Sequence, residues 1–237
     1  MKKIYETVSF KLLTILLIMI VVLTTIHLFF QYLNINLLRE EFGPIFELTN
    51  RLDFDDEVSI GTWITQFLYL LLSSLCFLAW YVSHNKKQKR LWLVVASGAL
   101  LGSIDEVAGL HELILQSIHN VYFINQAPTA LANAWWIVLP VIIMFSSLLI
   151  YYMKQVFDVI TVTAFTIGII IFLSGAVLVD VLTSFIVTTP FTSQGIFVAI
   201  EESLELIGLS LFIYAVAQFI EHNHNKQLRR AINQLKP

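Results

Sequence analysis

Six long apolar runs, separated by polar segments, constrain the fold of this chain more than any other feature. A helix of about 20 mainly apolar residues crosses the roughly 30 Å hydrocarbon core of a bilayer. Because the backbone must satisfy its own hydrogen bonds in lipid, several such runs predict a bundle of helices. We predict an all-α, polytopic, six-transmembrane-helix bundle with spans at residues 12–33, 61–82, 91–115, 135–152, 159–182 and 196–220.

The composition agrees with a protein that is integral to a membrane. The chain is 57% hydrophobic and only 13% charged, whereas a soluble domain is usually about half apolar and about a quarter charged. We expect a single integral-membrane domain over residues 1–237. Lys2 and Lys3 precede the first run, which is too long for a signal-peptide core and lacks a cleavage site, so we interpret it as a retained signal anchor. The one cysteine, Cys76, excludes an intrachain disulfide.

Positive charge marks one side of the predicted bundle. With six spans, the N-terminus, the 84–90 loop, the turn at Lys154 and the tail 221–237 share a side. Twelve of the 14 Lys and Arg residues lie there: Lys2, Lys3, Lys11, Lys86, Lys87, Lys89, Arg90, Lys154, Lys226, Arg229, Arg230 and Lys236. Only Arg39 and Arg51 lie opposite, in the acidic loop 34–60. The positive-inside rule therefore predicts that both termini are cytoplasmic, in the cytoplasmic (inner) membrane.

The third run carries charges that a bilayer disfavours. The stretch from Gly98 to His119 contains two adjacent acids, Asp105 and Glu106, and then His111 and Glu112. Intramembrane charges are expensive and mark functional sites by default. On one continuous helix, steps of three and four residues would place small and polar side chains on one face. They are Gly98, Gly102, Asp105, Gly109, Glu112, Gln116 and His119.

Polar residues of other runs fall at a similar depth. Counting about 1.5 Å per residue from a predicted start at Leu91 places Asp105 about 9 Å below the outer membrane surface. The same arithmetic brings polar groups of four helices to the outer half of the membrane. These groups are Asp105, Glu201, Glu202, His27 and Gln66, with Glu205 near the midplane and Asp180 close to the outer interface.

These acids have almost no basic counter-ions. From Leu91 to Asn225 the only Lys or Arg is Lys154, at the opposite end of its span. Clustered carboxylates in a medium of low dielectric constant cannot all stay ionised without compensation. Shared protons or a bound cation would provide it, so the sequence predicts a cation site or a proton relay.

The first functional hypothesis is a metal-dependent membrane enzyme, a hydrolase or an oxidoreductase, acting on a lipid or lipid-linked substrate. The predicted metal ligands are Asp105, Glu112, Glu202 and Glu205, completed by His27 or His111. Glu106 or Glu201 would be the general base, and Asp180 and Gln66 would lie nearby. A set rich in carboxylates and poor in histidine suits a divalent ion such as Fe, Mn, Mg or Zn.

Two other hypotheses use the same acids. One is a proton- or cation-coupled transporter or channel component, because carboxylate and histidine chains form relays in membranes. The apolar inner halves of runs 91–115, 159–182 and 196–220 speak against it. The other is a membrane binding or scaffold protein. The expected partners are the lipid bilayer and a lipid-like substrate or cation. We expect no nucleic acid, because topology and anionic lipids account for the basic segments.

Overall fold

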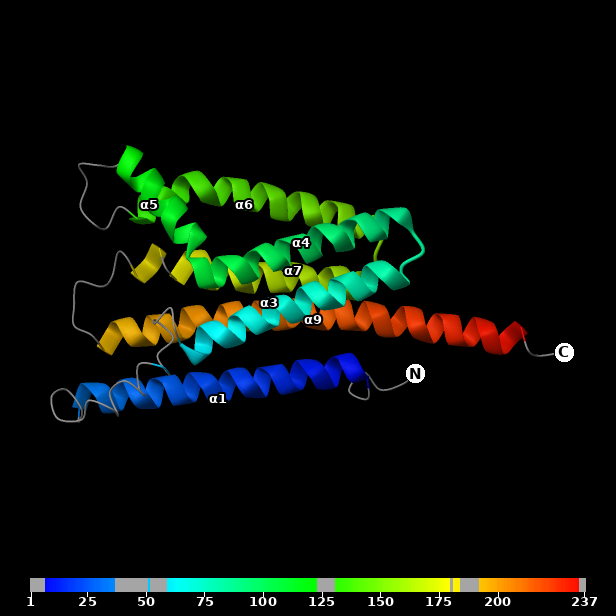
Figure 1. Cartoon of the computed structure of the whole chain (residues 1–237), viewed down its shortest axis with the longest axis horizontal. Coiled ribbons are helices and arrows are strands. Elements are labelled where there is room, and N and C mark those ends of the chain that lie inside the picture. The colour runs from blue at the N-terminus through cyan, green and yellow to red at the C-terminus, as the bar shows by residue number, and fades with distance from the viewer. Residues whose placement is uncertain are drawn as a thin grey trace.

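A computed structural model describes residues 7–36, 51, 59–122, 131–179, 181–183 and 192–234 (Figure 1). All regular structure in this part of the chain is helical, which confirms the all-α prediction. The helices are α1 (Val8–Asn36), α3 (Ile60–Val82), α4 (Lys86–Ala108), α5 (Leu110–Tyr122), α6 (Leu131–Lys154), α7 (Val159–Leu173) and α9 (Thr192–Gln234). A π-helical segment, η3 (Ser174–Val179), directly continues α7.

Four helical stretches among the described residues are long and apolar enough to cross a membrane. They are Val8–Phe30, Ile60–Val82, Lys86–Ala108 and Val159–Thr183. The second half of α6, Val138–Lys154, is a shorter apolar stretch. Large apolar side chains such as Val21 and Trp63 are 65% and 66% exposed. An exposed apolar surface of this extent suits contact with lipid rather than water.

The predicted span 91–115 is wrong as a single helix, because the chain forms two helices there. The α4 helix begins five residues earlier, at Lys86, after Asn85 caps it by accepting a hydrogen bond from the Lys87 amide. The predicted 84–90 loop is therefore mostly helix. At the other end Gly109 adopts a left-handed conformation, with φ of 55°, and separates α4 from α5. Glycine adopts this conformation without the steric penalty that a Cβ would bring.

The long helix α9 lies at the centre of the bundle and packs against α1, α3, α7 and η3 (Figure 1). It begins at Thr192 and continues to Gln234. The predicted end at residue 220 is therefore too early, and the described part of the basic tail belongs to the same helix.

The two ends of the bundle differ in charge. The start of α1, the α3–α4 and α6–α7 turns, and the last part of α9 lie at one end, which we call the basic end (Figure 1). Side-chain hydrogen bonds join these segments. The Ser9 hydroxyl donates to Glu221 over 3.1 Å, and the Gln88 amide donates to the Val156 carbonyl over 2.7 Å. The opposite end, which we call the acidic end, holds the α4–α5 junction and the start of α9.

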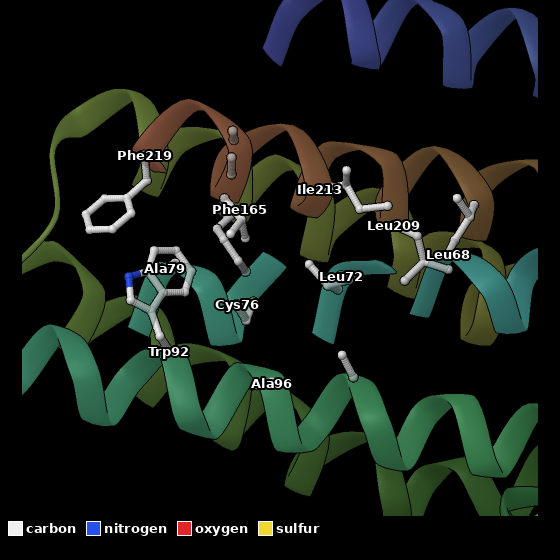
Figure 2. Close-up of a cluster of buried hydrophobic side chains, with 14 of the residues drawn as sticks. Leu68, Leu72, Cys76, Ala79, Trp92, Ala96, Phe165, Leu209, Ile213 and Phe219 are labelled. Carbon is white, nitrogen blue, oxygen red and sulfur yellow. The ribbon is translucent and has the colours of Figure 1, made fainter. Parts of the chain in front are cut away.

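The buried core is apolar and runs along α3, α4, α7 and α9 (Figure 2). Towards the basic end it is aromatic. The Trp92 ring is completely buried, and its centroid lies 4.7 Å from that of Phe157 and 5.0 Å from that of Phe219. Towards the acidic end aliphatic side chains such as Leu68 and Leu209 are buried, and the rings of Tyr69 and Phe172 are only partly buried. The apolar core therefore holds α3, α4 and α7 against α9. The half-buried acids lie beyond it, at the acidic end of the bundle.

Candidate functional site

The α4–α5 junction is held by the carboxylate of Asp105. Its Oδ1 accepts a hydrogen bond from the His111 amide over 2.8 Å, and its Oδ2 lies 2.9 Å from Nδ1 of the His111 ring. The Gly109 amide donates to the Asp105 carbonyl. Because both carboxylate oxygens face His111, the pair closes the turn and satisfies the His111 amide in the first turn of α5, as a capping side chain does.

This turn changes the predicted arrangement of polar residues. The α5 helix leaves the line of α4 and packs against α6 (Figure 1). The predicted stripe from Gly98 to His119 is therefore broken at Gly109. Asp105 and Glu106 also lie within one turn of the end of α4, and not in the middle of a continuous helix as the prediction implied. Glu106 is half-buried, within electrostatic reach of His111 and Asp105.

Three acids of α9 lie at the same end of the bundle. Glu201, Glu202 and Glu205 are half-buried. The backbone of Gly175 in η3 packs directly against this turn. A Cβ at Gly175 would lie 2.7 Å from the Glu201 carbonyl oxygen and 3.1 Å from Cγ of Glu205. Glycine therefore lets η3 approach α9 closely beside its carboxylates, as small residues do at membrane helix interfaces.

Tyr69 of α3 lies within electrostatic reach of acids on both α4 and α9. Its phenol lies within electrostatic reach of Glu205 and Glu202 on α9 and of Glu106 and Asp105 on α4. Its ring packs on the backbone of α4 at Gly102, where a Cβ would approach ring carbon Cε1 to 2.7 Å. The sequence analysis missed this residue because a tyrosine in an apolar run resembles a core aromatic. Gly102 on the facing helix could have indicated Tyr69, because a glycine leaves room for a ring.

An apolar cavity of about 290 Å³ begins at the Tyr69 ring. Among the described residues that line it, Tyr69 is the only one with a polar side-chain atom. Its floor is formed by buried residues such as Leu72 and Leu209, and its mouth lies at the exposed Val94 and Gly98 of α4. A Cβ at Gly98 would meet nothing within 4 Å, so this glycine leaves open space. The cavity thus extends from the Tyr69 ring to the surface of the bundle.

The remaining predicted site residues are His27, Gln66, Glu112 and Asp180, and the last two lie partly or wholly outside the described part of the chain. His27 of α1 is 1% exposed, and its Nε2 donates to the Gly195 carbonyl at the start of α9 over 3.2 Å. Nearby, the hydroxyls of Thr24 and Ser203 are 2.7 Å apart. His27 therefore contributes to packing between α1 and α9. Gln66 is half-buried on α3. The side chain of Glu112 and all of Asp180 lie outside the described residues.

The predicted metal centre is not supported by this geometry. Among the described residues, no three or more His, Cys, Asp or Glu side chains form a group that could hold a metal ion. These described residues include Asp105, His111, Glu202, Glu205 and His27, which belong to the predicted ligand set. Of the two predicted histidine ligands, His111 contacts Asp105 at the junction, and His27 is buried against α9.

The chain belongs to the family described as a domain of unknown function, DUF8692, whose model matches residues 12–219. This match covers all of the helices that form the core and the acidic end. No curated protein and no solved structure matches the chain.

Proposed function

We propose that this protein binds an amphipathic ligand of the membrane, with the apolar chain of the ligand in the cavity and its head group among the carboxylates. The position of Tyr69 is the observation that carries the proposal. Its ring lines the apolar cavity, and its phenol lies within electrostatic reach of four carboxylates. One side chain thus borders two environments that match the two parts of an amphiphile.

The chemistry of each part points to a class of ligand. An apolar cavity of about 290 Å³ suits one hydrocarbon chain or part of it, because small-molecule sites are concave and mostly apolar. The head group is expected to be cationic. The chain has no Lys or Arg between Arg90 and Lys154 or between Lys154 and Lys226, so a cationic head group would add positive charge to a stretch of the bundle that is rich in acids. A long-chain amine has both features.

We further propose a topology for this site. The helices α1, α3, α4, α6, α7 and α9 would span the membrane, and α5 would lie at its surface. Both termini would be cytoplasmic, because positive charges favour the cytoplasmic side, and the acidic end would face away from the cytoplasm. A C-terminal reporter enzyme that requires the cytoplasm should then be active, and activity only of a reporter that requires the exterior would overturn this topology.

Photo-crosslinking with a long-chain amine carrying a diazirine in its chain tests the binding proposal. We expect labelling of the purified protein, competed by the unlabelled amine and weakly by the alcohol of equal chain length. Tyr69→Phe and Glu205→Gln should each weaken labelling about tenfold, since a hydrogen bond to a charged group contributes about 1.5–3 kcal/mol. Equal competition by amine and alcohol would contradict a cationic head group.

The cavity is tested separately by filling it. Gly98→Leu adds a side chain to open space and should abolish labelling without disturbing the fold. The matched control is Ser97→Leu, which adds the same side chain at the next, exposed position outside the cavity. Unchanged labelling in Gly98→Leu would exclude this cavity as the site of the apolar chain.

A metal-dependent enzyme that acts on a lipid is a second candidate, and the Asp105–His111 pair favours it. A carboxylate bound to Nδ1 fixes the ring orientation and leaves Nε2 for a substrate proton or a metal such as Fe, Mn, Mg or Zn. Glu106, Glu201, Glu202, Glu205 and Glu112 would complete the site. Elemental analysis of protein purified in mild detergent, wild type against Glu202→Gln, tests this candidate. Absence of stoichiometric metal from the wild type would exclude it.

A further inference from the structure

We propose that the basic end of the bundle holds a second binding site, specific for the phosphate head group of an anionic phospholipid. A cavity of about 270 Å³ lies there between the first turns of α4 and the α6–α7 turn. Its lining residues are Lys87, Arg90, Leu91, Tyr152, Gln155 and Val156. This cavity shares no lining residue with the apolar cavity near Tyr69, so the two proposals are independent.

The charges of the lining fit a phosphate. The described lining contains two cations, Lys87 and Arg90, and no carboxylate. The nearest acid in the turn, Asp158, caps α7 by accepting hydrogen bonds from the Ile160 and Thr161 amides. An arginine fork and a lysine ammonium are the preferred partners of phosphate oxygens. The Tyr152 hydroxyl and the Gln155 amide supply further donors.

The cavity has a fixed shape, because two contacts hold its walls together. The Gln88 side-chain amide donates to the Val156 carbonyl over 2.7 Å and ties α4 to the α6–α7 turn. Beneath this bond the rings of Trp92 and Phe157 pack with centroids 4.7 Å apart. A site with preset walls loses little conformational entropy when it takes up a ligand.

The surroundings favour a lipid head group over a soluble phosphate. Lys87 and Arg90 lie at the beginning of a helix that is apolar enough to span a membrane. Leu91 and Val156 give the cavity apolar walls, and Tyr151 and Tyr152 beside it are 61% and 52% exposed. Exposed tyrosines at the ends of spanning helices lie at the level of the lipid head groups. Basic pockets in this position bind anionic lipids.

Native mass spectrometry of protein titrated with phosphatidylglycerol or phosphatidylcholine tests the proposal. We expect the wild type to bind phosphatidylglycerol preferentially. The double variant Lys87→Gln/Arg90→Gln should weaken this binding by about tenfold or more, since the loss of a single hydrogen bond to a charged group already weakens binding about tenfold. Arg90→Lys should retain part of the preference, because it keeps the charge but not the fork.

The matched control is Lys86→Gln/Lys89→Gln, which removes the same charge from neighbouring positions that do not line the cavity. Thermal unfolding without added lipid checks that both double variants are folded. We expect less than about a twofold loss in the control, because Lys86 and Lys89 do not line the cavity and cannot form these hydrogen bonds. Equal losses in the two double variants would overturn the proposal. Displacement of the lipid by inorganic phosphate at equal concentration would overturn the assignment to a lipid.

Discussion

At the basic end of the bundle the charged side chains lie outside an interior of aromatic rings, whereas at the acidic end carboxylates lie between the helices. Trp92 is completely buried beside Phe157 and Phe219 at the basic end. At the acidic end, Glu202, Glu205 and Asp105 lie within electrostatic reach of one phenol, that of Tyr69. The comparison indicates that buried aromatic packing is concentrated at the basic end and half-buried carboxylates at the acidic end.

The largest expected effect is at Trp92. Trp92→Ala should lower the free energy of unfolding in detergent by about 3–5 kcal/mol, because truncating a buried aromatic ring leaves a cavity. Trp92→Phe should cost only about 1 kcal/mol, since it retains most of the volume. The indole Nε1 also makes no hydrogen bond to the described residues. If both variants lose the same free energy of unfolding, the packing of the Trp92 ring does not explain the stability of the basic end.

At the acidic end, Gly102→Ala should be the most damaging small change. The added Cβ would lie 2.7 Å from Cε1 of Tyr69. Overpacking of this kind costs about 1–3 kcal/mol, and the displaced ring should also weaken amine labelling. The control is Gly98→Ala on the same helix, where a Cβ meets nothing within 4 Å. That variant should unfold with unchanged or slightly higher free energy, and equal destabilisation of the two would contradict the close contact with Tyr69.

The sequence predicted some features of α4 and missed others. Charge and hydropathy predicted the separation of basic and acidic ends and the gathering of acids from the 91–115 and 196–220 runs, because both depend on composition along the chain. The break at Gly109 was missed. Gly98, Gly102 and Gly109 look alike in sequence, and only tertiary packing determines that the third adopts positive φ.

The residues of the candidate site were predicted only in part from the sequence. The acids were found because charges in apolar runs are rare, but their partners depend on side-chain direction. His27 shares the predicted depth with Asp105 and nevertheless turns toward the Gly195 carbonyl. Tyr69 has no charge that would mark it. Its role follows from the Gly102 contact and from the cavity, which only the packing of several helices creates.

A moderate effect is expected when the α4–α5 junction is altered. Asp105→Ala should lower the free energy of unfolding by about 1 kcal/mol, as loss of a capping side chain does. Hydrogen exchange at the first amides of α5 should accelerate more than exchange elsewhere. Asn85→Ala, which removes the cap at the other end of α4, provides the control and should accelerate exchange near Lys87. Unchanged exchange at His111 in Asp105→Ala would contradict the hydrogen bond at this junction.

The smallest expected effect concerns the hydrogen bonds between α1 and α9. Their chemistry differs between the acidic and the basic end of the bundle. At the acidic end two hydroxyls meet, Thr24 and Ser203, 2.7 Å apart. A double-mutant cycle with Thr24→Val and Ser203→Ala should give a coupling of about 0.6 kcal/mol, the average for hydrogen bonds between membrane helices. At the basic end Ser9 donates to the carboxylate of Glu221. A cycle with Ser9→Ala and Glu221→Gln should give a larger coupling, because a charged acceptor strengthens the bond. A larger coupling at Thr24 would reverse the comparison and place the firmer attachment of α1 at the acidic end.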